Sequence, residues 1–143
     1  MDKKVIEILR VFLGLMWIVA GILKIPLSFF EAENMIKSFS ETCLIGFYSE
    51  IIKNYVLPNS FLVVLIIGIL EILTGILILR SEFLVKIGFC IGIFLNIIFL
   101  PLANYTIPIN LILIALQLFL LTKKFENSGT NILKDFILSL IKK

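Results

Sequence analysis

The chain has 143 residues, of which 60% are hydrophobic and 16% charged, with a net charge of +3 and no histidine. Soluble domains contain about 45–50% apolar residues, so this composition excludes an ordinary soluble enzyme and indicates an integral membrane protein. The absence of histidine excludes bis-histidine haem and most metal sites. We expect no nucleic-acid partner, because the basic residues follow a membrane-topology pattern.

Four apolar stretches, at about 5–24, 60–79, 83–102 and 105–122, each have the roughly 20 residues that cross a bilayer core of about 30 Å. The first begins like a signal peptide, but it lacks a small-residue cleavage site and its apolar run is long, so we expect a retained helix. The short turns between the last three stretches favour antiparallel neighbours. We therefore predict one all-α domain over 1–143, an integral membrane four-helix transmembrane bundle.

Two further segments have helical, amphipathic patterns. The outer segment 25–59 contains "PLSFFEAENMIKSF" and "LIGFYSEIIKNYVLP", which predict two short helices at the outer membrane surface. Lipid, the mouth of the bundle and a partner protein remain open as the surface that they cover. At 130–143 an apolar face opposite lysines predicts a C-terminal interfacial helix on the anionic cytoplasmic leaflet.

The basic residues are distributed unequally between the two predicted sides. Ten of the 13 Lys and Arg residues lie on the side of the termini and the middle loop, and only Lys24, Lys37 and Lys53 lie on the other. This positive-inside bias predicts that both termini are cytoplasmic. Cys43 and Cys90 form no CxxC or metal-ligand spacing, so a thiol redox motif is not expected, and the role of Cys43 is open.

A carboxylate interrupts the second apolar stretch, "GILEILTGILIL" at 68–79. Glu71 there would cost about 2.5 kcal/mol or more to insert into a membrane, so it must face protein and find a partner. On the first stretch one stripe faces it, made of Arg10, Gly14, Trp17, Gly21 and Lys24. Counted from the predicted cytoplasmic ends at 1.5 Å per residue, Arg10 lies about 8 Å deep and Glu71 about 12 Å deep. We therefore predict an Arg10–Glu71 ion pair.

This pair is expected to belong to a polar pocket. Thr74 and Gln117 are predicted to join it in the inner half, and Asn96 and Asn110 to lie in the outer half, whereas Lys24 is interpreted as a snorkelling anchor. The candidate ligand-binding residues are Arg10, Trp17, Glu71, Thr74, Gln117, Asn96 and Asn110. Three roles are open: fixing the helix register, binding a quinone head group beside the Trp17 ring, and an ion path.

At these residues the chain resembles the DoxX family. "LRVFLGLMWIVAGILKI" at 9–25 is similar to the first helix of that family and 68–79 to its second, and the likeness extends over about 9–122. Arg10, Gly21, Lys24, Glu71 and Gly75 match the family pattern. Related MauE-type redox-associated proteins share the layout. The cysteine cluster of some MauE-type proteins and the histidines of many DoxX-like chains are missing here.

The resemblance implies a multi-pass protein of a bacterial or archaeal cell membrane, linked to thiosulfate:quinone oxidoreductases or to oxidative-stress complexes. We therefore expect a small membrane subunit that docks a membrane or extracytoplasmic oxidoreductase and contacts quinone, at most as a non-catalytic part of an enzyme. One alternative is a structural or assembly protein without chemistry of its own. Another is a small-solute transporter, which a chain of this length would form only as a homo-oligomer.

Overall fold

The computed structural model describes residues 3–125 together with 129 and 138, and this part of the chain consists of helices joined by short turns, without a strand. The all-α prediction is thereby confirmed. The α-helices are α1 (Lys3–Phe30), α2 (Ala32–Thr42), α3 (Gly46–Ile51), α4 (Ser60–Ile78), α5 (Glu82–Phe99) and α6 (Ile107–Leu121). A π-helical turn, Ile52–Val56, follows α3. The helix predicted at 130–143 lies outside the described residues.

Four helices in this described part are long and apolar enough to cross a membrane. They are α1, α4 counted together with α3 and the turns between them, and α5 and α6 each counted with a neighbouring turn. Their outward faces carry large exposed apolar side chains, for example Phe12 (63% exposed), Phe94 (62%) and Ile112 (61%). Monomeric soluble proteins rarely expose continuous apolar surfaces of this kind. The helices are therefore those of a multi-pass membrane protein in a lipid bilayer.

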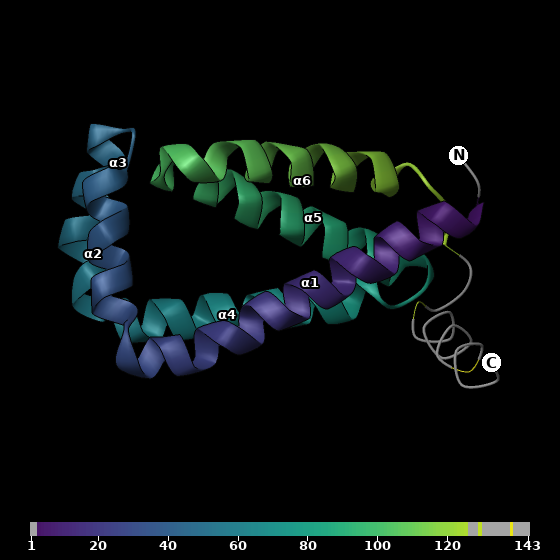
Figure 1. Cartoon of the computed structure of the whole chain (residues 1–143), viewed down its shortest axis with the longest axis horizontal. Helices are drawn as coiled ribbons and strands as arrows, with labels where there is room; N and C mark the ends of the chain where they lie inside the picture. Colours follow the sequence, from purple (N-terminus) through teal and green to yellow (C-terminus); the bar gives the residue numbers. More distant parts are fainter. Residues whose placement is uncertain (1–2, 126–128, 130–137, 139–143) are drawn as a thin grey trace.

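The long helices form an open series in which α1 packs on α4, α4 on α5, and α5 on α6. Figure 1 shows that α1 and α6 approach each other near the end where the N-terminus lies and diverge towards the opposite end. A first apolar core, which includes Leu13, Trp17, Phe89 and Leu120, lies among these helices. The space between the diverging helices is bounded at its wide end by the segment that joins α1 to α4.

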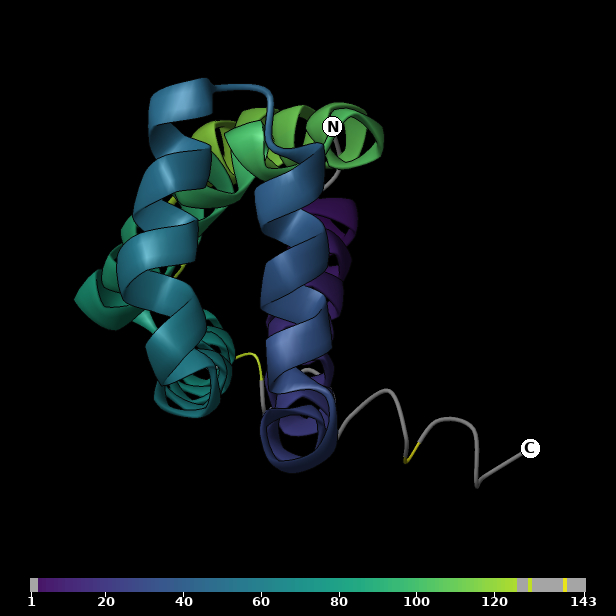
Figure 2. The same cartoon turned by 90° about the vertical axis from the view of Figure 1, so that its left-hand side faces the viewer.

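That joining segment, residues 32–59, is called the α2–α3 cap. Figure 2 shows α2 and the α3 stretch lying antiparallel, side by side, across the end of the long helices. Ala32, Ile36 and Ile52 of the cap pack on Val64 of α4 in a second apolar core. The Tyr48 hydroxyl donates to the Ile98 carbonyl oxygen at 3.1 Å, so the cap is also attached to α5.

Helices α1 and α4 are in backbone contact at two pairs of glycines. A Cβ atom on Gly21 would collide with the carbonyl oxygen of Gly68, and a Cβ atom on Gly75 with that of Gly14. Small residues permit such close approach of helices in membranes. The two contacts lie seven residues apart on both helices, and they fix one antiparallel register along the whole pair.

This register leaves α1 extending beyond α4. Helix α1 has 28 residues and α4 has 19. Because Gly14 lies opposite Gly75, Arg10 lies opposite Leu79, just after the last residue of α4. At its other end α1 continues through Pro26 to Phe30, six residues past the predicted end of the first span, since membrane helices tolerate an internal proline.

Candidate functional site

The buried carboxylate of α4 forms an ion pair with a lysine of α1. Lys24 Nζ lies 2.8 Å from both carboxylate oxygens of Glu71. The Glu71 side chain is 2% exposed and that of Lys24 is 24% exposed. A neutral, hydrogen-bonded pair is what permits ionisable groups at membrane depth. The interpretation of Lys24 as a snorkelling anchor is therefore wrong, because its ammonium turns towards the protein.

The predicted Arg10–Glu71 pair is also wrong, and the register explains why. The α4 position opposite Arg10 is eight residues from Glu71, an axial distance of about 12 Å at 1.5 Å per residue. The α4 position opposite Lys24 is only about 9 Å from Glu71. Side chains on a helix also tilt towards its N-terminus. In this antiparallel pair that tilt directs Lys24 and Glu71 towards each other, and it directs Arg10 away from Glu71.

Arg10 instead connects three segments at the end opposite the cap. Its guanidinium lies 2.8 Å from the Glu7 carboxylate, donates to the Arg80 carbonyl oxygen at 3.1 Å, and stands 4.7 Å from the centre of the Phe125 ring. The side chain is fully buried. A cation at the C-terminal end of α4 also interacts favourably with the helix dipole. Arg10 thus holds α1, the α4–α5 turn and the segment after α6 together.

The remaining predicted residues are dispersed rather than gathered into one pocket. The Thr74 hydroxyl donates to the Leu70 carbonyl oxygen of its own helix. The Asn96 amide donates to the Gln117 side-chain oxygen at 3.3 Å and links α5 to α6. Trp17 is 3% exposed within the first apolar core. These contacts connect or stabilise helices. Of the seven candidates, Asn110 lines the cavity between the long helices and the cap, and the other six do not line it.

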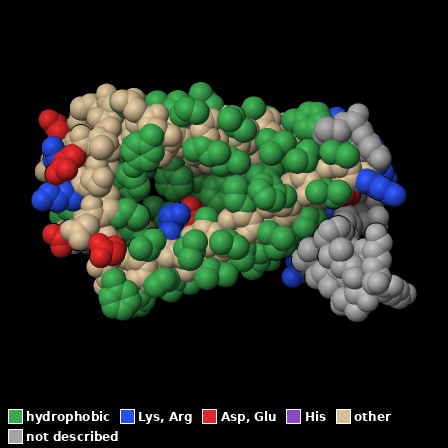
Figure 3. Space-filling view, in the orientation of Figure 1, with side chains coloured by type: hydrophobic (Ala, Val, Ile, Leu, Met, Phe, Trp, Pro, Cys, Tyr) green, Lys and Arg blue, Asp and Glu red, His purple; other side chains and the backbone are tan. Residues whose placement is uncertain are grey.

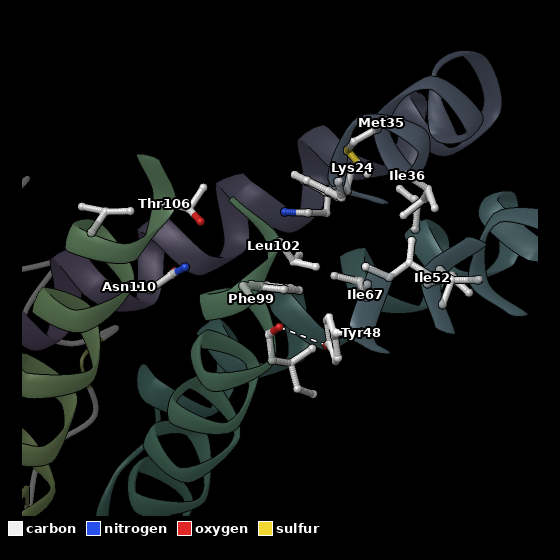
Figure 4. A pocket seen from close by; sticks show the side chains of 16 residues that line it. Lys24, Met35, Ile36, Tyr48, Ile52, Ile67, Phe99, Leu102, Thr106 and Asn110 are labelled. Atoms are coloured by element: carbon white, nitrogen blue, oxygen red, sulfur yellow. Dashed lines mark hydrogen bonds between the residues drawn. The ribbon is translucent and has the colours of Figure 1, made fainter. Parts of the chain in front are cut away.

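That cavity has a volume of about 270 Å³ and lies between the diverging long helices and the α2–α3 cap. Its wall is almost entirely apolar and includes aromatic side chains from three elements (Figure 4). The lining residues include Met35, Ile36, Phe39, Tyr48, Ile52, Val63, Val64, Ile67, Ile98, Phe99, Leu102 and Ile109. Three polar side chains complete the wall on the side of α1 and α6: Lys24, Thr106 and Asn110.

Two of these polar groups have hydrogen-bonding capacity to spare. An ammonium has three N–H donors, and Glu71 accepts two from Lys24, which leaves one without a partner among the residues described. The Asn110 side chain is 7% exposed and makes no hydrogen bond within that part of the structure either. Figure 4 shows its amide and the Lys24 ammonium both directed into the cavity. A hydrogen bond from this amide would contribute about 0.5–1.5 kcal/mol net, so an occupant with a matching polar group would be stabilised.

The cavity is open to the side. In Figure 3 a basic and an acidic side chain lie together in a hollow surrounded by apolar side chains, between the elements that Figure 1 labels α6 and α1. The basic residue that lines the cavity is Lys24, and its acidic partner is Glu71. Ile109 lines the cavity and is 53% exposed, which places it at the edge of the opening.

The sequence carried a signal for Lys24 that depth counting did not use. Gly21 and Lys24 are three residues apart on α1, as are Gly68 and Glu71 on α4. Once the two glycines are paired, the tilt of helical side chains brings the charges together. The cavity itself had no such signal, because its wall is built from apolar and aromatic residues of seven helical segments.

No protein-family model, curated protein or solved structure matches the chain. The resemblance to the DoxX family therefore has no support from these comparisons. Within residues 3–125, 129 and 138, no group of three His, Cys, Asp or Glu side chains could hold a metal ion.

Proposed function

We propose that the protein is a small multi-pass membrane subunit of a quinone-linked redox complex, and that it binds an amphipathic molecule of the quinone class in the cavity beneath the α2–α3 cap. The observation that carries the proposal is the combination of an apolar wall with one ion pair and one free amide. Ligand sites have this composition: mostly apolar and aromatic walls with a few polar groups that orient the ligand.

The aromatic lining suits a flat ring. Phe39, Tyr48 and Phe99 come from the cap and from α5 and stand around the cavity, whereas Trp17 is buried in the first apolar core. Aromatic pairs contribute about 0.5–1.5 kcal/mol beyond their buried area. A ring between these side chains would have its polar atoms near Lys24 and Asn110. The ring-flanking role predicted for Trp17 passes to these three residues in the proposal.

The chain contributes binding and orientation in this proposal rather than electron transfer. The titratable groups at the cavity are Lys24, its partner Glu71, and Tyr48, whose hydroxyl is committed to Ile98. We propose that a membrane or extracytoplasmic oxidoreductase supplies the redox centre, and that the α2–α3 cap faces it on the outer side of the membrane.

A structural or assembly role is the second candidate. It is favoured by the contacts of Arg10 and by the Asn96–Gln117 hydrogen bond, which hold helices together and leave no group exposed for chemistry. Under this alternative the Lys24–Glu71 pair fixes the register of α1 on α4, and the cavity contains ordinary membrane lipid.

Native mass spectrometry of the protein, extracted gently from its own membrane, separates the two candidates. We expect a retained quinone, an oxidoreductase subunit, or both. A protein that carries only phospholipid in repeated preparations would contradict the proposal and support the structural role. As a control, the variant Asn110→Leu should retain less quinone than the wild-type protein while its lipid content stays unchanged.

A further inference from the structure

We infer that the cavity takes its ligand sideways from the bilayer, through the opening between α1 and α6, and that it selects a neutral lipid whose head carries a carbonyl-type acceptor. The inference deepens the proposed function and rests on the same cavity. It concerns the route of access and the chemistry of the head group. It can therefore be wrong even if the protein binds quinone, and it can be right if the ligand is another lipid with a carbonyl group.

The route follows from the packing of the long helices. Each neighbouring pair in the series from α1 to α6 is in contact, but α1 and α6 are not a packed pair along their length in the described structure. The cavity lies where they diverge, and its wide end is covered by the cap (Figures 1 and 2). The hollow in Figure 3 is on a side face of the long helices. In a membrane a side face meets lipid, so the opening connects the cavity with acyl chains rather than with water.

The size of the cavity requires that part of the ligand remains outside. Pockets that enclose a drug-sized molecule measure about 300–1,000 Å³. A cavity of about 270 Å³ therefore holds a head group and the first carbons of a chain. The remaining chain would leave past Ile109, at the edge of the opening, and continue along apolar surface. This arrangement fits a lipid that is dissolved in the bilayer.

The charge of the site favours a neutral head. Lys24 and Glu71 are 2.8 Å apart and cancel each other, so the site has no net charge to offset a charged ligand. An anionic head near Lys24 would lie within the field of the Glu71 carboxylate, and a cationic head would meet the ammonium. Either charge would lose its hydration in an apolar cavity without full compensation.

The hydrogen-bonding groups favour an acceptor. The third N–H of Lys24 can only donate, and the amide of Asn110 can donate through its NH₂ group. Both point into the cavity in Figure 4. A carbonyl oxygen, with two lone pairs, can accept from either side chain, whereas a hydrocarbon head would leave both groups without a partner.

The test compares three ligands with alkyl chains of eight to ten carbons: a decyl-substituted benzoquinone, decan-2-one as a simple ketone, and decanoate as the anion. Binding is measured with the full-length protein in lipid nanodiscs. We expect both carbonyl compounds to bind and decanoate to bind at least about tenfold more weakly. Asn110→Leu should weaken the carbonyl compounds by about threefold to tenfold, the effect of one hydrogen bond. Equal or tighter binding of decanoate would overturn the head-group inference.

The route is tested by a matched pair of substitutions on α6. Ile109→Trp places a large ring at the edge of the opening, and Ile112→Trp places the same ring on the lipid-exposed face one turn away. Ile109→Trp should slow association or weaken binding by about tenfold, and Ile112→Trp should change neither. Equal effects of both variants would overturn lateral access. Binding of the ketone alone, without the quinone, would contradict the proposed function but support this inference.

Discussion

At the scale of single residues, the Lys24–Glu71 pair is the feature with the largest energetic consequence. Removing one partner of a buried ion pair leaves an uncompensated charge and destabilises a protein by about 3–5 kcal/mol. We predict that Lys24→Met lowers the free energy of unfolding by this amount, because Glu71 is 2% exposed and has no other partner among the described residues. The double variant Lys24→Met/Glu71→Met should recover most of the loss. Reversible unfolding in mixed detergent micelles measures both.

Arg10 provides the control for that experiment. Arg10→Gln and Glu71→Gln should be additive within about 0.5 kcal/mol, as for residues without a shared partner, because Arg10 pairs with Glu7 rather than with Glu71. A strong coupling between Arg10 and Glu71, with none between Lys24 and Glu71, would show that the register of α1 on α4 differs from the one described.

At the scale of helices, α1 and α4 leave no room for an additional side-chain atom at their two glycine contacts. Gly21→Ala and Gly75→Ala would each drive a methyl group into a backbone carbonyl oxygen of the facing helix. Overpacking of this kind costs about 1–3 kcal/mol. We predict a loss of that size for each variant in the same unfolding measurement. Gly46→Ala is the matched control, since a Cβ atom there meets nothing within 4 Å, and it should leave stability unchanged.

The sequence was sufficient to predict the long helices but not their register. Each long apolar stretch is sufficient by itself to indicate a span, since length and composition determine whether a helix can cross a bilayer. Register depends instead on how two helices meet. Counting depth from the ends of apolar stretches assumed that α1 and α4 end together, whereas α1 extends beyond α4 and places Arg10 opposite Leu79.

The cap shows the same limit. The amphipathic patterns at 25–59 predicted helices at a surface. The apolar face of such a helix can pack equally well on lipid or on the apolar wall of a cavity, so the pattern alone did not distinguish these two surfaces. Contacts that are distant in the sequence decide it, such as the bond from Tyr48 to the Ile98 carbonyl oxygen and the packing of Ile36 and Ile52 on Val64.

At the scale of the whole molecule, the two apolar cores and the cavity between the helices divide the protein into a tightly packed end and an open end. Arg10, Glu7 and Phe125 belong to the packed end, and Lys24 and Asn110 belong to the open end. Lack of a partner does not distinguish the two ends, because Trp17 Nε1 in the first apolar core and Gln117 Nε2 are buried without a hydrogen-bond partner in the described part of the chain. Asn110 differs from them in lining the cavity, and this position makes it a candidate ligand-binding residue.

The same division predicts which end faces the cytoplasm. The structure places Lys53 in the cap and Lys124 at the packed end, and both side chains are exposed. Among the ten Lys and Arg residues that the structure describes, seven lie near the N-terminus, the α4–α5 turn or the end of α6, on the side of Lys124. Because basic residues are retained on the cytoplasmic side of membranes, the packed end should be cytoplasmic and the cap should be outside.

Cysteine labelling in intact bacterial cells tests this orientation. In a background with Cys43→Ser and Cys90→Ser, the variant Lys53→Cys should react with a membrane-impermeant maleimide in intact cells. Lys124→Cys should react only after the cells are permeabilised, because its side chain lies at the other end of helices that cross the bilayer. The reverse pattern would place the cap in the cytoplasm. The lateral opening, which lies on a side face, would meet lipid in either orientation, but a redox partner at the cap would then have to be cytoplasmic.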